Sequence, residues 1–112
     1  MSWANTAEAD RVATQIEARL RECEALLSAD QPNVCEALTR VTWAGGQVLD
    51  ALPPSQRQTL STAMQGAMLV ADKAARGDLG ACLIAFHQIA QPLRAIACTV
   101  RAAQHIASRR AS

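Results

Sequence analysis

The stretch LGACLIAFHQIAQPL, from Leu79 to Leu93, contains no formally charged side chain. A helix of this composition must bury most of its circumference, either inside a bundle or against a second chain. His87 and Pro92 interrupt the stretch, which is shorter than the ~18 to 20 apolar residues that span a bilayer. The sequence therefore predicts a core helix of a helical protein, and it predicts no membrane partner.

The composition extends this prediction to the whole chain. Half of the 112 residues are hydrophobic, but only 3% are aromatic, namely Phe86 and two tryptophans. Alanine, leucine, arginine, glutamine and glutamate lead the scale of helix propensity, whereas β-branched and aromatic residues lead the scale of strand propensity. A chain of this length forms one domain. We therefore expect a single all-α domain over residues 1–112.

The first helix is expected to begin at Asn5 or Thr6 and to end near Ala29. Asn5 and Glu8 have the spacing of a capping box, in which two side chains satisfy the free amides of the first turn. The apolar positions recur every three or four residues, as they do on the buried face of a helix. This stripe consists of Val12, Ile16, Leu20, Cys23 and Leu27.

The second helix is expected between residues 33 and 53. Asn33 and Glu36 repeat the capping pattern at its start, and Pro53 with the proline after it ends the helix. Gly45 and Gly46 lie inside this segment, where they predict either a break or a close contact with another helix. The apolar stripe consists of Val34, Leu38, Val41, Val48 and Leu52.

Two more helices complete the predicted fold. Ser55 and Gln58 indicate the start of the third, which Gly77 ends; Asp78 is the expected N-cap of the fourth, which continues to about Ser108. The apolar stripe of the third helix consists of Leu60, Met64, Met68 and Ala71. Four helices with short connections predict a four-helix antiparallel bundle.

The charge is close to zero overall but is unevenly distributed. The net formal charge is +1; residues 1–50 hold eight acids and four arginines, whereas residues 51–112 hold two acids and seven bases. Glu17 lies four residues before Arg21, a spacing that favours a local ion pair on a solvent-facing side of the first helix. Nucleic-acid binding requires a clustered basic face and a high pI. We therefore expect no nucleic-acid partner.

Polar side chains align along one face of the fourth helix. At about 100° per residue, one line contains His87, Gln91, Arg94, Cys98, Arg101 and His105. The same face continues upstream through Gly80, Leu83 and Ile84, so it is apolar in its first turns. Exposed leucine and isoleucine predict a second chain that covers them, and a symmetric homodimer is the simplest cover. The predicted partner-binding residues are Gly80, Leu83, Ile84, His87, Gln91 and Arg94.

The segment HQIAQPLRAI, residues 87–96, resembles the phosphoacceptor box of sensor histidine kinases. In that family a helical histidine is followed by an apolar residue, then by Pro-Leu and Ala-Ile. The match consists of His87, Ile89, Pro92, Leu93, Ala95 and Ile96. The resemblance implies that an imidazole nitrogen of His87 accepts phosphate. Gln88 stands where the family has an acid, and the chain has no Gly-rich nucleotide loop, so the phosphate is expected to come from another protein.

The cysteines are expected to be reduced thiols. Residues 1–9 lack the apolar segment of a secretory signal, which favours a cytoplasmic location, where cysteines stay reduced. The cysteines are Cys23, Cys35, Cys82 and Cys98. Their spacing matches no metal site, so we expect no metal and no cofactor. Cys98 lies near Arg94 and Arg101, whose positive charge favours a thiolate, and it is therefore a candidate redox thiol.

These patterns leave three classes of function open. The first is a non-enzymatic regulator that binds another protein, such as an antiactivator that masks a transcription regulator, or a helical chaperone. The second is a histidine phosphoacceptor module that uses His87, and the third is a redox-responsive adaptor that uses Cys98. The pattern shows no paired carboxylates for catalysis and predicts no enzyme. We favour the first class because it requires only the apolar face that the sequence already implies.

Overall fold

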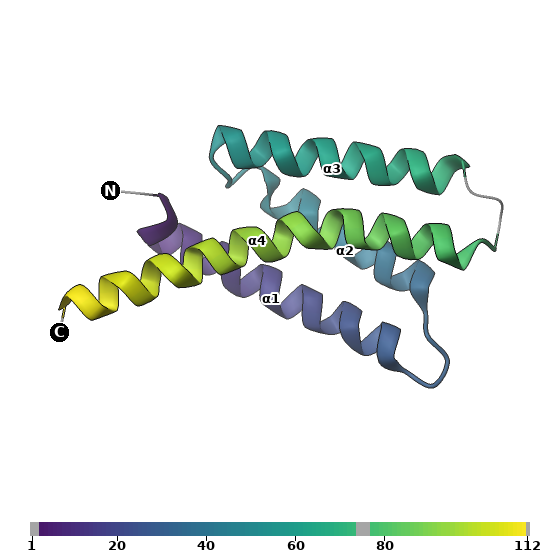
Figure 1. The fold of residues 1–112 in the computed structure, drawn as a ribbon, viewed down its shortest axis with the longest axis horizontal. Helices are drawn as coiled ribbons and strands as arrows, with labels where there is room; N and C mark the ends of the chain where they lie inside the picture. The colour runs from purple at the N-terminus through teal and green to yellow at the C-terminus, as the bar shows by residue number, and fades with distance from the viewer. Residues whose placement is uncertain (1–2, 74–76, 112) are drawn as a thin grey trace.

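Four helices make up the fold. The computed structural model describes residues 3–73 and 77–111. The elements are the short 3₁₀-helix η1 (Trp3–Asn5), α1 (Ala7–Ser28), α2 (Val34–Leu49), α3 (Pro54–Lys73) and α4 (Leu79–Ala111). These described residues contain no strand, and the predicted all-α, four-helix architecture is confirmed (Figure 1).

The helices α1 and α2 begin with side-chain caps. The backbone N–H of Ala9 donates to Oγ1 of Thr6 at 3.1 Å, so Thr6 caps α1. The predicted capping box of Asn5 and Glu8 is wrong, because Asn5 belongs to η1 and the first helical turn begins after Thr6. The predicted cap of α2 is confirmed: the N–H of Glu36 donates to Oδ1 of Asn33 at 3.1 Å.

The starts of α3 and α4 follow different rules. α3 begins at Pro54, where the missing N–H costs nothing because the first helical amides have no partner in the helix. The predicted start at Ser55 and Gln58 is therefore wrong. The predicted cap of α4 is confirmed, since the N–H of Ala81 donates to Oδ1 of Asp78 at 3.0 Å. Gly77 before it has a φ of 87°, a left-handed conformation that glycine adopts without strain.

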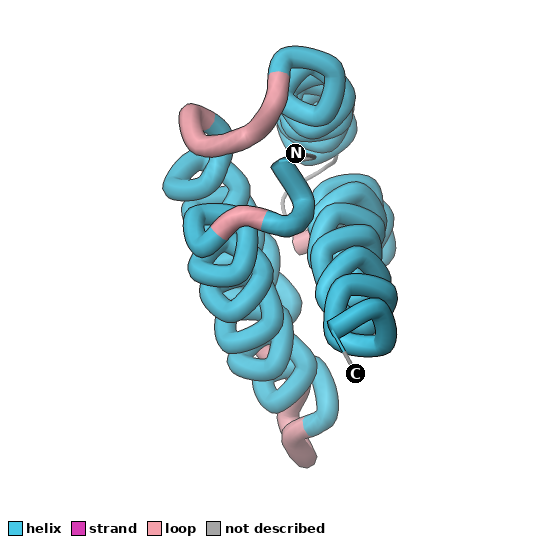
Figure 2. Tube along the Cα trace, turned by 90° about the vertical axis from the view of Figure 1, so that its left-hand side faces the viewer, coloured by secondary structure: helices cyan, strands magenta, loops and turns pink. Residues whose placement is uncertain are grey.

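The bundle is flat, and α4 lies at its centre. Successive helices run in opposite directions, so α2 and α4 run the same way (Figure 1). α4 packs against each of α1, α2 and α3, whereas α1 and α3 do not touch. The molecule measures 53 × 31 × 16 Å along its principal axes, and Figure 2 looks along the longest of them. The last turns of α4 project beyond the other helices (Figure 1).

The core lies where the inner faces of the helices meet along α4. The largest fully buried side chains are Phe86, Ile16, Leu52, Leu60, Ile89, Leu93, Val41, Val48, Val100 and Cys23. The predicted stripes of the first two helices are buried except at Leu27 and Leu38, which are half-buried. α2 ends at Leu49, earlier than expected, so Leu52 is buried from the connection after the helix. The predicted stripe of α3 is wrong at Met68, which is 56% exposed. The reason is that α3 packs mainly on α4 and makes little contact with α2.

By length and composition, α4 is long and apolar enough to cross a membrane, whereas the sequence predicted no segment of that kind. The difference arises because the helix continues well past the uncharged stretch, to Ala111. The core helix of a soluble protein passes the same test. The packing of α4 against three other helices accounts for its apolar residues on the buried side.

Gly45 and Gly46 do not break α2, which continues through both. A Cβ atom on Gly45 would lie 3.0 Å from Sδ of Met64 and 3.7 Å from Cγ2 of Ile89. Gly45 therefore marks the close helix contact that the sequence predicted as one alternative. Gly46 is exposed and a Cβ there would meet no atom within 4 Å.

Substituting these adjacent glycines is expected to have opposite effects. Gly46→Ala stabilises the protein by about 0.5–1 kcal/mol, because alanine loses less backbone entropy in a helix and the site is open. Gly45→Val destabilises it by roughly 1–3 kcal/mol, because the new side chain overlaps Met64. Urea unfolding followed by circular dichroism measures both changes. Equal effects of the two substitutions would contradict the assigned packing.

Candidate functional site

Three large aliphatic side chains near the start of α4 are exposed to solvent. Leu79 is 53%, Leu83 37% and Ile84 56% exposed, and we call these three residues the apolar strip. Leu79 and Leu83 are four residues apart, so they lie on adjacent turns of one side of the helix. Ala85 and Phe86, which directly follow the strip, are completely buried. The predicted exposure of Leu83 and Ile84 is thus confirmed.

The strip borders small and polar residues that were predicted to share its surface. Gly80, His87 and Gln91 are all exposed. A Cβ atom on Gly80 would lie 3.5 Å from Oδ1 of Asp78, the residue that caps α4, and it would meet no atom of another helix within 4 Å. No other helix therefore covers this position. The missing side chain lets the backbone of another molecule approach α4 closely. Gly80, the strip, His87 and Gln91 together form one open surface on α4.

His87 lies at the edge of the core. Its imidazole packs edge-on against the buried ring of Phe86, with 5.2 Å between the ring centroids and 74° between the planes. The residue itself is exposed, as is Gln88 after it. This arrangement fixes one side of the imidazole while the side chain stays accessible from solvent.

The C-terminal half of the predicted polar face is bound to α1. Nη1 of Arg101 donates to Oδ1 of Asp10 at 2.7 Å, its Nε donates to Oε1 of Glu17 at 3.2 Å, and its Nη2 donates to Oγ1 of Thr14 at 3.0 Å. Gln104 also donates to Asp10, at 2.6 Å. We call these contacts the Arg101 clasp. The local pair of Glu17 with Arg21 that the sequence predicted gives way to this contact between helices.

Arg94 also points toward α1. Its Nη2 lies 3.5 Å from Oε1 of Glu24, and the residue is half-buried. Arg94 was predicted to bind a partner, but the fold already supplies this arginine with an acid. The open surface of α4 therefore ends near Gln91.

The clasp changes the pKa values of its members. Hydrogen bonds from Gln104 and then from Arg101 lower the pKa of Asp10 below its usual 3.8. The hydrogen bond from Arg101 lowers the pKa of Glu17 below its usual 4.5. The same two carboxylates raise the pKa of Arg101, Glu17 more strongly. Because a lowered pKa means that the folded state favours the carboxylate, the stabilisation is present above the usual pKa values and is lost as pH falls below them.

Replacing Arg101 is expected to reduce this acid dependence. The wild type loses stability as the pH falls below about 4.5, while its carboxylates take up protons. Arg101→Ala is less stable than the wild type at pH 7, and the difference between the two shrinks toward pH 3. Thermal unfolding at a series of pH values measures both trends. A constant difference between wild type and variant over this range would contradict the clasp.

Cys98 is exposed, and a shallow groove of about 330 Å³ between α1 and α4 includes it. The arginines expected to favour its thiolate, Arg94 and Arg101, are both paired with acids of α1. Those acids offset much of the positive charge on which the redox hypothesis for Cys98 rests.

The other three thiols lie in different surroundings. Cys23 is buried as predicted, and its Sγ donates to the carbonyl oxygen of Ala37 at 3.6 Å. Cys35 is exposed at the start of α2, and Cys82 is half-buried at the start of α4. Cys35 lies near enough to Cys82 to contribute to the raised pKa of the Cys82 thiol, after burial. Spacing along the chain gave no sign of this pair, because it depends on how α2 and α4 pack.

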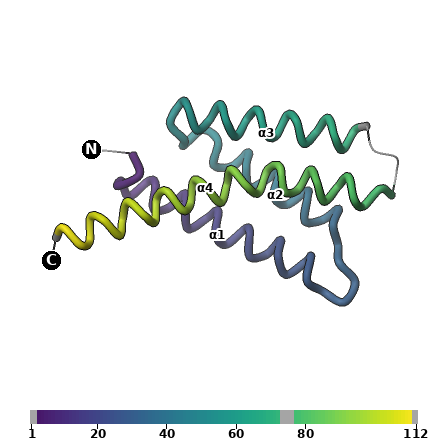
Figure 3. Tube along the Cα trace, in the orientation of Figure 1, coloured from purple at the N-terminus to yellow at the C-terminus, as the bar shows by residue number. Residues whose placement is uncertain are grey.

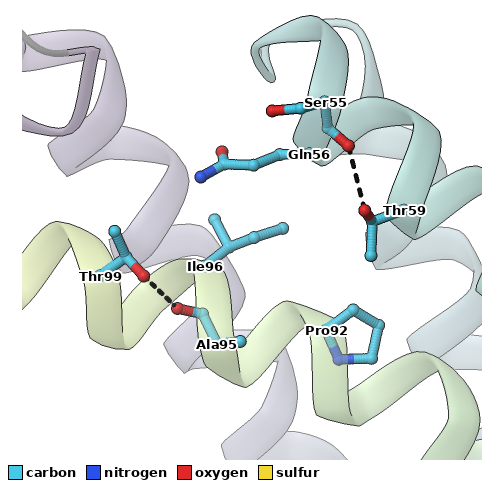
Figure 4. A pocket seen from close by; sticks show the side chains of 7 residues that line it. All are labelled: Ser55, Gln56, Thr59, Pro92, Ala95, Ile96 and Thr99. Atoms are coloured by element: carbon cyan, nitrogen blue, oxygen red, sulfur yellow. Dashed lines mark hydrogen bonds between the residues drawn. The ribbon is translucent and has the colours of Figure 1, made fainter.

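A small pocket of about 190 Å³ lies between α3 and α4 (Figure 4). Its lining residues are Ser55, Gln56, Thr59, Pro92, Ala95, Ile96 and Thr99. Two of its hydroxyls are already used, since Oγ1 of Thr59 donates to the Ser55 carbonyl at 3.0 Å and Oγ1 of Thr99 to the Ala95 carbonyl at 2.9 Å. Oε1 of Gln56 is buried and accepts no hydrogen bond. The sequence gives no sign of this pocket, because it depends on how α3 and α4 pack.

An exposed tryptophan lies on α2. Trp43 is 60% exposed, and the guanidinium carbon of Arg19 lies 5.5 Å from the centroid of its ring. The cation–π contact holds the aromatic ring against α1 while leaving much of it open to solvent. Trp43 is therefore another exposed apolar group, on a different helix from the strip.

Within residues 3–73 and 77–111, no three histidine, cysteine, aspartate or glutamate side chains gather in a way that suits a metal ion. Comparison with known proteins gives no match: no family model, no curated protein and no solved structure is similar to the chain.

Proposed function

We propose that this protein is a small, non-enzymatic regulator that acts by binding another protein through the open surface of α4. The observation that carries the proposal is the exposure of the apolar strip, on a helix whose opposite side forms the core. Burying a leucine or isoleucine completely contributes about 1.5–3 kcal/mol relative to leaving it exposed. A partner that covers Leu79, Leu83 and Ile84 would gain part of this free energy from each.

The simplest partner is a second copy of the chain. In a symmetric dimer the same surface serves both subunits, so each strip covers the other. Gly80 supports this arrangement, because it lets the two copies of α4 approach closely beside Leu83 and Ile84. An amphipathic helix of a target protein would bury the same strip and approach α4 at Gly80 in the same way. It would therefore compete with the dimer for the strip.

In this proposal the target is another cytoplasmic protein whose own helical interface becomes masked. A transcription regulator that must dimerise is one such target, and in that case the protein acts as an antiactivator. A helical chaperone would use the same surface on an unassembled partner. Both roles need an apolar surface and neither needs a catalytic group.

Affinity capture with matched variants tests the proposal. The tagged chain is used to recover partners from the native cell, and Ile84→Asp is compared with Ile106→Asp. Ile106 is the appropriate control because it lies on the same helix and is 53% exposed, against 56% for Ile84. We expect Ile84→Asp to lose the partner and Ile106→Asp to retain it. Equal recovery by the two variants would contradict the assignment of the strip.

The exposure of His87 favours a second candidate function, acceptance of a phosphoryl group from another protein. An imidazole that is held by Phe86 on one side and open to solvent on the other is accessible to a phosphorylated receiver domain. Incubation with such a domain is expected to label the wild type but not His87→Gln. Equal labelling of both proteins, or of neither, would rule out His87 as the acceptor.

A further inference from the structure

The packing of α2 on α4 brings two cysteines together from distant parts of the chain. Both helices begin at the same end of the bundle and run in the same direction (Figure 3). Their register is fixed further along, where a Cβ on Gly45 would lie 3.7 Å from Cγ2 of Ile89, and where Leu38 and Ile89 line one small cavity. Cys35 is the second residue of α2 and Cys82 the fourth of α4, so both thiols lie in the first helical turns.

The two thiols lie in the first turns of two helices that pack together, and they differ in their access to solvent. Cys35 is near enough to Cys82 to contribute to the raised pKa of its thiol. Cys35 is exposed, whereas Cys82 is half-buried. A small oxidant can therefore reach Cys35 more readily than Cys82, which lies nearby.

We propose that Cys35 and Cys82 form an oxidation site that closes to an intramolecular disulfide when the protein meets a peroxide. The Cys35 thiolate attacks one peroxide oxygen, the O–O bond breaks, and Cys35 becomes a sulfenic acid while the other oxygen leaves as water after protonation. The Cys82 sulfur then attacks the Cys35 sulfur and expels hydroxide, which takes the Cys82 proton and leaves as a second water. Two thiols are oxidised to one disulfide, and one peroxide is reduced to two waters.

The surroundings of Cys82 make it the less reactive of the two thiols toward peroxide. Burial, and next the neighbouring Cys35, raise the pKa of the Cys82 thiol, so this residue stays protonated and is a poor first nucleophile. The other two cysteines offer no such pair. Cys23 is buried and donates to Ala37, and Cys98 lies on α4 beside α1. The inference does not depend on the proposed binding function.

Peptide mapping of the oxidised full-length chain tests the proposal. The reduced protein is freed of reductant, treated with hydrogen peroxide, blocked with an alkylating agent and digested with trypsin without reduction. Cleavage after arginine places Cys82 in residues 77–94 and Cys98 in residues 95–101, while Cys35 shares residues 22–40 with Cys23. Mass spectrometry of the digest, together with Cys35→Ser, Cys82→Ser and Cys98→Ser, identifies the linked residues.

The expected product is a disulfide between the peptides 22–40 and 77–94, formed in the same yield at low and high protein concentration. Cys98→Ser forms it as the wild type does, whereas Cys35→Ser and Cys82→Ser do not. The proposal is overturned if the wild type gives no such link, if the link persists in Cys35→Ser, or if it forms only between molecules. The wild-type result decides the matter even if a variant fails to fold.

Discussion

Replacing Phe86 with alanine is expected to lower the free energy of unfolding by about 3–5 kcal/mol. Phe86 is the largest of the completely buried side chains, and it lies on α4, the helix that contacts all three others. The substitution removes most of an aromatic side chain and leaves a cavity that the surrounding helices fill only in part. Since small domains are stable by only about 5–15 kcal/mol, this is a large fraction of the total.

Chemical unfolding of Phe86→Ala measures the loss, and His87→Ala is its matched control. His87 is the next residue on the same helix but is exposed, so its removal costs only the edge-on contact with Phe86. Exposed substitutions of this kind change stability by about 0.5 kcal/mol or less. A large loss at His87 together with a small one at Phe86 would mean that α4 is rotated from the orientation described.

The second large effect is expected at the apolar strip. Introducing aspartate at both Leu83 and Ile84 weakens self-association by on the order of 100-fold or more, equivalent to about 2.7 kcal/mol, because carboxylates would have to be buried without partners. Both positions are exposed in the single chain, so its helicity is retained. The dissociation constant is measured by sedimentation equilibrium, and helicity by circular dichroism.

Leu69→Asp is the control for the double variant. Leu69 is 58% exposed but lies on α3 and is not part of the strip. Its substitution adds one carboxylate, half the charge of the double variant, to an exposed aliphatic position and should leave the association unchanged. If Leu69→Asp dissociated the protein as strongly as the double variant, net charge would explain the effect and the strip would not be the interface.

Local sequence signals predicted the elements well where the deciding interaction is local. Asn33 and Asp78 each accept from an amide three residues ahead, which the sequence shows directly. The exposure of Leu83 and Ile84 was also predictable, because an uncharged helix with one buried side still has apolar residues left for the other. The start of α3 was predicted at Ser55, one residue too late, because the pattern assigns the two prolines only to the end of the previous helix. Proline also fits the first position of a helix, and α3 begins at Pro54.

The contacts between helices were not predictable in this way. Arg101 binds Asp10 and Glu17, which lie 91 and 84 residues away, while the local pairing rule considers only partners three or four residues away. The proximity of Cys35 and Cys82 likewise depends on the register of two parallel helices. Both features follow from the central position of α4, which periodicity alone does not determine.

The central claim is that another chain covers the apolar strip, and the mass of the wild-type protein in solution tests it most directly. One chain has a mass of 11.9 kDa. Sedimentation equilibrium over a wide range of concentrations is predicted to give twice that mass as the concentration rises, and the Leu83 and Ile84 double substitution is predicted to return it to the mass of one chain. A wild-type protein that stays at 11.9 kDa at every concentration, and that recovers no partner from its native cell, would contradict the account.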